Sequence, residues 1–278
     1  MSKKTDEVQS IIEKSGNSFH SRVVNLLREG GWTVLVSPYY SDNFTDKPRE
    51  IDIIAEKGFD IGMWVNEWVG TVNVQLFLEC KYINEKIVFW FDAKDEYRAI
   101  ERIMKDTRLE HPNQNNSIRV HHYLSDAFVA KLFASLKRDG SDEHNLFQRA
   151  INQSLNALVS YRFKYNLIPP VKHMREKIRH RIVYPMIVCN SFENFYQKKI
   201  ADAESEVEQI SKPFQLEVNY AYKNMGGVGL NEYFLIDVID IEQLSAFLAS
   251  IEKTDITAVK EHLLWEERAK PSSSNQQN

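Results

Sequence analysis

Two short stretches of the chain decide its fold: Lys47-Pro48-Arg49-Glu50-Ile51-Asp52-Ile53-Ile54 and Leu76-Phe77-Leu78-Glu79-Cys80-Lys81-Tyr82. Each is rich in branched or aromatic residues and carries isolated charges, which is typical of a β-strand. Because side chains alternate along a strand, Glu79 and Lys81 are expected on one face and Cys80 on the other.

The first stretch is expected to alternate in the same way. A period of two places Glu50, Asp52 and Ile54 on one face, opposite Ile51 and Ile53. If the two strands pair, the carboxylate of the first stretch can meet the two charges of the second.

The chemistry of Asp52, Glu79 and Lys81 favours a site for phosphodiester hydrolysis. Three charges brought together in a fold are costly unless they neutralise one another or hold a cation. Two carboxylates are ligands for a hard divalent ion, Mg²⁺ or Mn²⁺, and the carbonyl of Cys80 is available as a third oxygen. A bound metal lowers the pKa of a coordinated water, and a nearby lysine can position that water or neutralise a phosphate oxygen.

At these residues the chain resembles the PD-(D/E)xK nuclease superfamily, which has the restriction-endonuclease-like fold. The resemblance rests on Glu50-Ile51-Asp52-Ile53-Ile54, on Glu79-Cys80-Lys81, and on the preceding helix and Gly-Gly-Trp segment from Phe19 to Trp32. It covers roughly the first 90 residues. It implies a metal-dependent endonuclease with Asp52, Glu79 and Lys81 as catalytic residues, DNA as substrate, and a role in restriction, phage defence or repair.

Two positions depart from the pattern of that superfamily. Many members carry a glutamate on the first helix, where this chain has His20, and this departure bears on whether the metal shell is complete. Pro48 also lies four residues before Asp52 rather than next to it, a spacing that many members relax.

The rest of the chain predicts an α/β fold with a mixed sheet core flanked by helices and a helical insertion. Residues 1–92 are expected to form the first part of the core, and residues 93–142 the insertion, with helices over 94–108 and from Ala127 through Phe133. Residues 143–268 are expected to complete the core, and residues 269–278 to form a disordered tail. Residues 58–71 are interpreted as the connection between the two decisive strands, with Trp64 and Trp68 packing within it rather than stacking on bases.

The strongest helical pattern runs from Glu143 to Tyr161, where apolar residues recur at helical spacing. In many nucleases of the superfamily, the helix after the Glu-x-Lys strand supplies a glutamine or tyrosine near the site. Gln153 and Tyr161 are therefore candidate supporting residues, as are His20 and Glu50. An ordinary amphipathic core helix explains Gln153 and Tyr161 equally well.

The densest basic run in the chain lies between Val171 and Arg181. This basic run is interpreted either as a set of phosphate contacts or as a solvated linker. Its candidate nucleic-acid-binding residues are Lys172, Arg175, Lys177, Arg179 and Arg181.

The composition is that of an ordinary globular protein: 278 residues, 43% hydrophobic and 27% charged. There is no apolar run of membrane-spanning length and no signal-peptide core, and two cysteines in apolar runs indicate buried thiols in a reducing cytoplasm. The net charge of −4 argues against wholesale coating of nucleic acid. A homodimer or an unidentified partner subunit is compatible with the sequence.

Three alternatives stay open at this point. The fold can serve as a binding module whose catalytic shell has decayed, or the triad can be a structural salt-bridge cluster. A zinc hydrolase is disfavoured, because the adjacent rings of His121 and His122 are expected to diverge.

Asp237 and Asp240 are expected to end a buried strand and to cap the helix that follows it.

Overall fold

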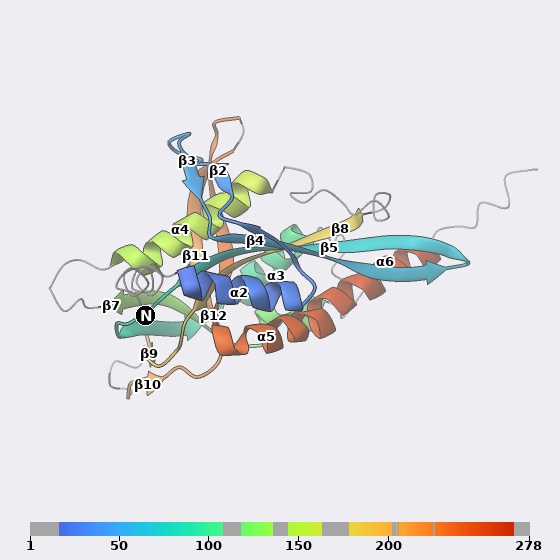
Figure 1. The fold of residues 1–278 in the computed structure, drawn as a ribbon. Helices are drawn as coiled ribbons and strands as arrows, with labels where there is room; N and C mark the ends of the chain where they lie inside the picture. The colour runs from blue at the N-terminus through green and yellow to red at the C-terminus, as the bar shows by residue number, and fades with distance from the viewer. Residues whose placement is uncertain are drawn as a thin grey trace, which may run out of the picture.

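The computed structural model describes residues 17–107, 118–135, 144–162, 178–201, 204, 206–224 and 226–269. Within these residues the chain is an α/β protein in which helices flank one large mixed sheet (Figure 1). No helix in this part of the chain is long and apolar enough to cross a membrane.

Ten strands form the large sheet, in the order β1-β4-β5-β8-β12-β11-β7-β6-β9-β10. β5 pairs antiparallel with β4 and parallel with β8, and β8 pairs parallel with β12. The strands of this sheet are β1 (Thr33–Val36), β4 (Ile53–Trp64), β5 (Glu67–Lys81), β6 (Ile87–Ala93), β7 (Phe128–Ser135), β8 (Ile178–Cys189), β9 (Phe195–Lys199), β10 (Glu208–Gln209), β11 (Phe214–Lys223) and β12 (Gly229–Asp240).

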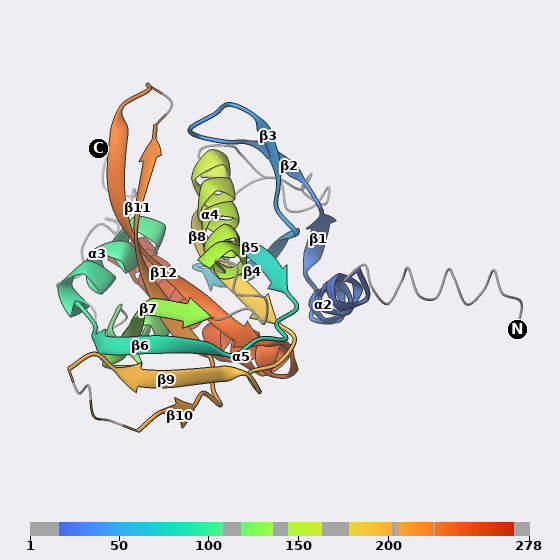
Figure 2. The ribbon, with the colours of Figure 1, turned by 90° about the vertical axis from the view of Figure 1, so that its left-hand side faces the viewer.

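The helices cover both faces of the sheet. α4 packs on one face, where its Ser154 hydroxyl donates to the carbonyl of Phe77 in β5 (3.0 Å), and α2, α3, α5 and α6 pack into the core on the other face (Figure 2). The α-helices are α2 (Asn17–Glu29), α3 (Glu96–Thr107), α4 (His144–Tyr161), α5 (Leu244–Ile251) and α6 (Thr257–Ala269). Short 3₁₀ turns cover Ile118–Val120, His122–Leu124 and Ile241–Gln243, and a π-helical turn, Glu252–Ile256, joins α5 to α6.

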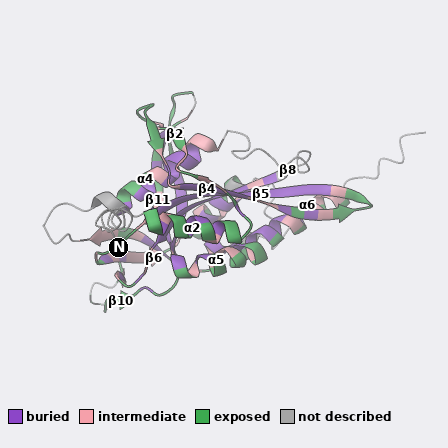
Figure 3. Cartoon of the chain, in the orientation of Figure 1, coloured by how far each residue is buried: buried purple, intermediate pink, exposed green. Residues whose placement is uncertain are grey.

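The central strands are buried on both faces, which explains their composition. β5 is buried from Val69 to Cys80, and Figure 3 shows the burial continuing into its neighbours, while the outer faces of the helices are exposed. One face of β5 is apolar, whereas the other carries the buried polar residues Thr71, Asn73, Gln75 and Glu79 beside Phe77. A charged side chain within β5 therefore has to find its partner inside the protein.

β4 and β5 form one long hairpin. The expected connection over residues 58–71 is therefore wrong: the two strands stay paired from Ile53↔Leu78 to Trp64↔Glu67, and only Val65 and Asn66 form the turn. Both turn residues have positive φ (46° and 65°), as a tight two-residue hairpin turn requires. Trp68 packs within the hairpin, where its indole N–H donates to Asp60 (2.8 Å).

The first decisive stretch is not one continuous strand. Pro48–Glu50 forms β3, which pairs with β2 (Tyr39–Ser41) in a separate two-stranded sheet, and β4 begins only at Ile53. The chain turns at Ile51–Asp52, so that Ile51 joins the core under α4 and Ile53 joins the core on the opposite face. The expectation that both isoleucines share one face is wrong for this reason.

The segment 93–142 is not an all-helical insertion. It contains α3 as expected, but the predicted helix from Ala127 through Phe133 is the strand β7, which lies in the large sheet between β6 and β11. The apolar residues of Phe128–Ser135 fit both periods, and pairing with the neighbouring strands decides in favour of the strand. The helix expected over 143–161 is present as α4.

Candidate active site

The hairpin of β4 and β5 brings three predicted residues together, and we name Asp52, Glu79 and Lys81 the rim cluster. Asp52 immediately precedes β4, and the antiparallel register that pairs Ile53 with Leu78 places it beside Glu79. The Lys81 ammonium lies 2.6 Å from Glu79 Oε2 and 3.6 Å from Asp52 Oδ2. The backbone N–H of Asp52 also points toward Glu79 Oε1 (3.4 Å). One ammonium therefore bridges two carboxylates.

The burial of the rim cluster is uneven. The Glu79 side chain is fully buried, whereas Asp52 and Lys81 each keep 15% of their side-chain surface exposed. Burial raises the pKa of Glu79 to about 8; Lys81 opposes this rise and Asp52 adds to it. Burial alone would lower the pKa of Lys81, but the Glu79 and Asp52 carboxylates raise it above its ordinary value. At neutral pH the ammonium stays charged, and Glu79 can exchange a proton.

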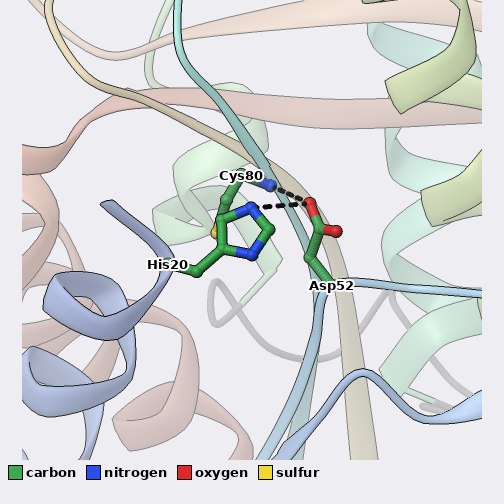
Figure 4. A group of neighbouring side chains, drawn as sticks. All are labelled: His20, Asp52 and Cys80. Atoms are coloured by element: carbon green, nitrogen blue, oxygen red, sulfur yellow. Dashed lines mark hydrogen bonds and ion pairs between the residues drawn. The ribbon is translucent and has the colours of Figure 1, made fainter. Parts of the chain in front are cut away.

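The two oxygens of Asp52 have different surroundings. Oδ2 accepts the backbone N–H of Cys80 (2.8 Å) and lies 3.6 Å from His20 Nε2, so that both nitrogens point at the same oxygen (Figure 4). Oδ1 accepts no hydrogen bond from any described residue. A carboxylate oxygen that is partly exposed and uncommitted is a good ligand for a hard cation.

His20 joins the site, as its position in the sequence predicts. It is on the first full turn of α2, and its imidazole is 28% exposed beside Asp52. At this position the helix offers a nitrogen ligand beside Asp52. Imidazole is a better ligand for transition metals than for Mg²⁺.

The other proposed supporting residues act at a distance from the rim cluster. The Gln153 amide donates to the carbonyl of Glu50 (3.2 Å), and the Tyr161 hydroxyl donates to the carbonyl of Tyr39 (2.8 Å). Both fasten α4 to the small sheet of β2 and β3. The Glu50 carboxylate makes no ion pair with Lys81 in the described part of the chain. The sequence named these residues as candidate supporting residues, and in the structure Gln153 and Tyr161 bind backbone carbonyls of the small sheet rather than the side chains of the rim cluster.

The basic run is only partly described. Lys172, Arg175 and Lys177 lie outside the described residues, as do residues 270–278 of the expected tail, and the side chain of Arg179 is not described. Arg181 lies in β8, eight residues before Cys189, which pairs with Lys81. At 3.3 Å per residue this separation is about 26 Å. Arg181 is therefore far from the rim cluster along the sheet.

A second polar cluster lies on the opposite face of the sheet, and we call it the buried network. Its members are His121, His122, Tyr184, Asp237 and Asp255. His122 donates from its backbone and from Nδ1 to Asp255, and its Nε2 lies 3.1 Å from Asp237 Oδ2. The Tyr184 hydroxyl donates to Asp255 Oδ2 (2.8 Å). The rings of His121 and His122 stack at 4.8 Å between centroids rather than diverging, so the expected geometry of this pair is wrong.

The hydrogen bonds of the buried network leave no lone pair for a metal on His121. The backbone N–H of Tyr123 donates to His121 Nδ1 (3.1 Å), so that nitrogen carries no hydrogen and Nε2 carries one. His121 Nε2 lies 3.2 Å from Asp255 Oδ2, which suits an N–H facing a carboxylate. Burial lowers the pKa of His121 to about 3, while Asp255 and Asp237 outweigh burial and raise the pKa of His122 to about 10. The arrangement is that of a charged, hydrogen-bonded support.

Sequence reasoning missed the role of Asp255 and misjudged Asp237. Asp237 is 1% exposed and faces His122, whereas Asp240 is the helix cap, accepting the N–H of Glu242 (2.9 Å). A hydrophobic run that ends in two aspartates gives no signal to separate these roles. The helical position of Asp255 likewise does not reveal its partner 133 residues away.

No model of a protein family matches the chain, and no solved structure matches it. In an alignment of 199 positions that covers 67% of the chain, it is 21% identical to Protein MGF 360-3L of African swine fever virus. The chain spans 56% of the length of that viral protein. The name of the viral protein states no activity, so a functional proposal depends on the geometry of the site.

Proposed function

We propose that the protein is a metal-dependent endonuclease that hydrolyses phosphodiester bonds in DNA, and that the rim cluster is its active site. The observation that carries the proposal is the position of Lys81 Nζ, 2.6 Å from Glu79 and 3.6 Å from Asp52 at one end of the sheet. Two carboxylates and one ammonium in contact are the groups that this reaction needs.

The donor set fits a divalent cation. Asp52 Oδ1 is uncommitted, Glu79 lies beside Asp52, and the Cys80 carbonyl belongs to the same strand end. Asp52 and Glu79 would hold Mg²⁺ or Mn²⁺, which when bound lowers the pKa of a coordinated water and balances charge on the phosphate.

The residues of the chain have separate roles in this proposal. Glu79 gives up its proton when it becomes a ligand, because its pKa of about 8 leaves it largely protonated at neutral pH. Lys81 stays protonated, so it positions the attacking water or neutralises a phosphate oxygen rather than acting as a base.

The order of elements supports the same proposal. α2, β1, β4 and β5 occur in the chain order that the resemblance to the PD-(D/E)xK superfamily implies, with the short strands β2 and β3 between β1 and β4. The Glu-x-Lys strand β5 is followed by β6 and α3, and α4 comes only after β7. This resemblance also supplies the expectation that the substrate is DNA, and roles in restriction, phage defence or repair are carried over by analogy alone.

The test is cleavage of supercoiled plasmid and of single-stranded DNA by purified protein with Mg²⁺ or Mn²⁺. Wild-type protein is expected to cut, and Asp52→Asn and Lys81→Ala to be inactive while folded. Asp92→Asn is the matched control, because Asp92 is an exposed strand aspartate that pairs with Lys131 instead (3.5 Å). Equal cutting by all four proteins would refute the proposal.

The complete burial of Glu79 favours one alternative, a nuclease-fold module that binds nucleic acid or protein without cutting. In that case the contact between Lys81 Nζ and Glu79 Oε2 (2.6 Å) takes the place of a metal permanently. Wild-type protein would then neither cut DNA nor bind Mn²⁺ measurably, whereas the proposed nuclease does both.

A further inference from the structure

A second set of possible ligands surrounds Asp52 on the other face of β5. A ring nitrogen of His20, an Asp52 carboxylate oxygen and Cys80 Sγ all lie within 4.8 Å of one another (Figure 4). Glu79 and Lys81 lie on the α4 face of β5, whereas Cys80 belongs to the core on the α2 face. Asp52, at the turn before β4, is within reach of both faces.

We infer that His20, Asp52 and Cys80 form a binding site for a thiophilic divalent cation of the Zn²⁺ class, distinct from the pair of Asp52 and Glu79. One nitrogen, one oxygen and one sulfur ligand with a fourth position for water is a donor set that Zn²⁺ accepts. The hard ions Mg²⁺ and Mn²⁺ prefer the oxygen pair on the other face.

The distances suit such an ion. Zn²⁺ binds nitrogen and oxygen at about 2.0–2.2 Å, which puts two tetrahedral ligands about 3.4 Å apart. His20 Nε2 and Asp52 Oδ2 are 3.6 Å apart, too far for a hydrogen bond and close to that separation. The same Asp52 oxygen is held in place by the Cys80 backbone N–H (2.8 Å).

His20 is also available as a ligand, in contrast to His121. No described residue makes a hydrogen bond to the His20 imidazole that would fix which nitrogen carries the hydrogen, so Nε2 can present its lone pair. Its 28% exposure gives an ion a route from solvent to the buried thiol. When Sγ binds the ion, the thiol proton leaves to solvent and no other bond changes.

Cys189 provides an internal control for this inference. It lies in the neighbouring strand β8, where it pairs with Lys81, and it is as buried as Cys80. Its side chain belongs to the core under α4, on the face opposite Cys80. A metal at the inferred site therefore needs Cys80 and not Cys189.

The test is titration of reduced, untagged protein with Cd²⁺, followed by the ultraviolet charge-transfer absorption of a cadmium–thiolate bond. We expect one equivalent to produce the band in wild type, in Cys189→Ser and in Glu79→Gln, and Cys80→Ser to abolish it. His20→Ala, at a partly exposed helix position, is expected to weaken Cd²⁺ binding at least about 100-fold, since even the loss of an outer partner costs 10–100-fold.

Absence of the band in wild type would overturn the inference, as would a band that survives in Cys80→Ser or depends on Cys189. The result is separable from the proposed nuclease. A cadmium band without DNA cleavage would uphold this site and reject the nuclease, and cleavage without a band would do the reverse. Thermal unfolding of Cys80→Ser reports whether the serine is tolerated, and His20→Ala tests the same site without altering the core.

Discussion

The rim cluster and the buried network lie on opposite faces of one sheet, and both join aspartates or glutamates to a cation. They differ in how completely the carboxylates are used. In the buried network, four hydrogen bonds end on Asp255, from the backbone N–H and Nδ1 of His122, from Tyr184 and from Thr254. In the rim cluster, Asp52 Oδ1 accepts none from the described residues, and Lys81 and His20 both stay 3.6 Å from Oδ2.

This difference distinguishes buried carboxylates that stabilise the fold from buried carboxylates that can bind a ligand. A carboxylate whose lone pairs are all taken stabilises the fold and has nothing left for a ligand. A carboxylate held by one backbone N–H, with an open oxygen and with its nearest side-chain nitrogens 3.6 Å away, can bind an ion without breaking the structure around it. Substitutions in the rim cluster and in the buried network test this contrast.

The largest effect is expected on stability, from Asp255→Asn in the buried network. The substitution leaves the charge of His122 buried with half of its partners, which costs about 3–5 kcal/mol of unfolding free energy. Urea unfolding measures the loss, and Asp92→Asn, at a surface ion pair, is expected to change stability by less than about 1 kcal/mol. A comparable small change for Asp255→Asn would remove the structural role assigned to the network.

The next effect is on chemistry, from Lys81→Ala in the rim cluster. Removing a charge that stabilises the transition state is expected to lower the cleavage rate by about 100–1000-fold. Lys131→Ala serves as control, because Lys131 is a partly buried strand lysine that pairs with Asp92. Equal loss in both variants would show that the effect is not specific to the rim cluster.

The affinity of the rim cluster for Mn²⁺ is expected to rise with pH. Glu79 has a pKa of about 8 and must lose its proton to act as a ligand. One displaced proton changes affinity by up to about tenfold per pH unit below that value, hence by up to about 100-fold between pH 6 and 8. Calorimetry in two buffers of different ionisation enthalpy measures both the affinity and the proton released. A pH-independent affinity would exclude Glu79 as the group that ionises.

The buried network is expected to give its greatest stabilisation near pH 6.5. The pKa of His122 is raised to about 10, so its contribution is full below the unfolded value of about 6.5 and is lost as pH rises through 10. The pKa of His121 is lowered to about 3, so its contribution is full above about 6.5 and is lost as pH falls toward 3. The stability difference between wild type and Asp255→Asn should therefore shrink as pH rises from about 6.5 toward 10, and a flat difference over this range would contradict the charged state of His122.

The smallest effect is expected from Glu79→Gln on stability. The raised pKa of Glu79 means that wild-type protein loses stability as pH rises from about 4.5 through 8, because only the folded state resists ionisation. Glutamine copies the protonated carboxyl, so the variant should lie within about 1 kcal/mol of wild type near pH 4.5 and gain on it as pH rises toward 8. A loss as large as that of Asp255→Asn would mean that the ion pair with Lys81 is a support of the fold.

The sequence predicts local features of this protein well and distant ones poorly. The meeting of Asp52, Glu79 and Lys81 follows from strand alternation and from pairing of neighbouring strands, both of which act over short range. The break at Ile51–Asp52 was not predicted, because it depends on Glu50 pairing with Tyr39 in another sheet. β7 was mistaken for a helix, because Phe128–Ser135 satisfies both periods until its neighbours are known.

The buried network marks the limit of such reasoning. Asp255 meets His122 across 133 residues and Tyr184 across 71, and no spacing rule connects them. Only the packing of the turn between α5 and α6 against the sheet brings these groups together. The side chains that support the fold were therefore harder to predict than those of the candidate active site.

The most direct test of the central claim is Mn²⁺ binding at pH 8, measured by calorimetry on wild type, Asp52→Asn and Asp92→Asn. We expect wild type and Asp92→Asn to bind one Mn²⁺ per chain at the rim cluster with equal affinity. Folded Asp52→Asn is expected not to bind Mn²⁺. Unchanged binding by Asp52→Asn, or no binding by wild type, would contradict the assignment of a metal-dependent site to Asp52, Glu79 and Lys81.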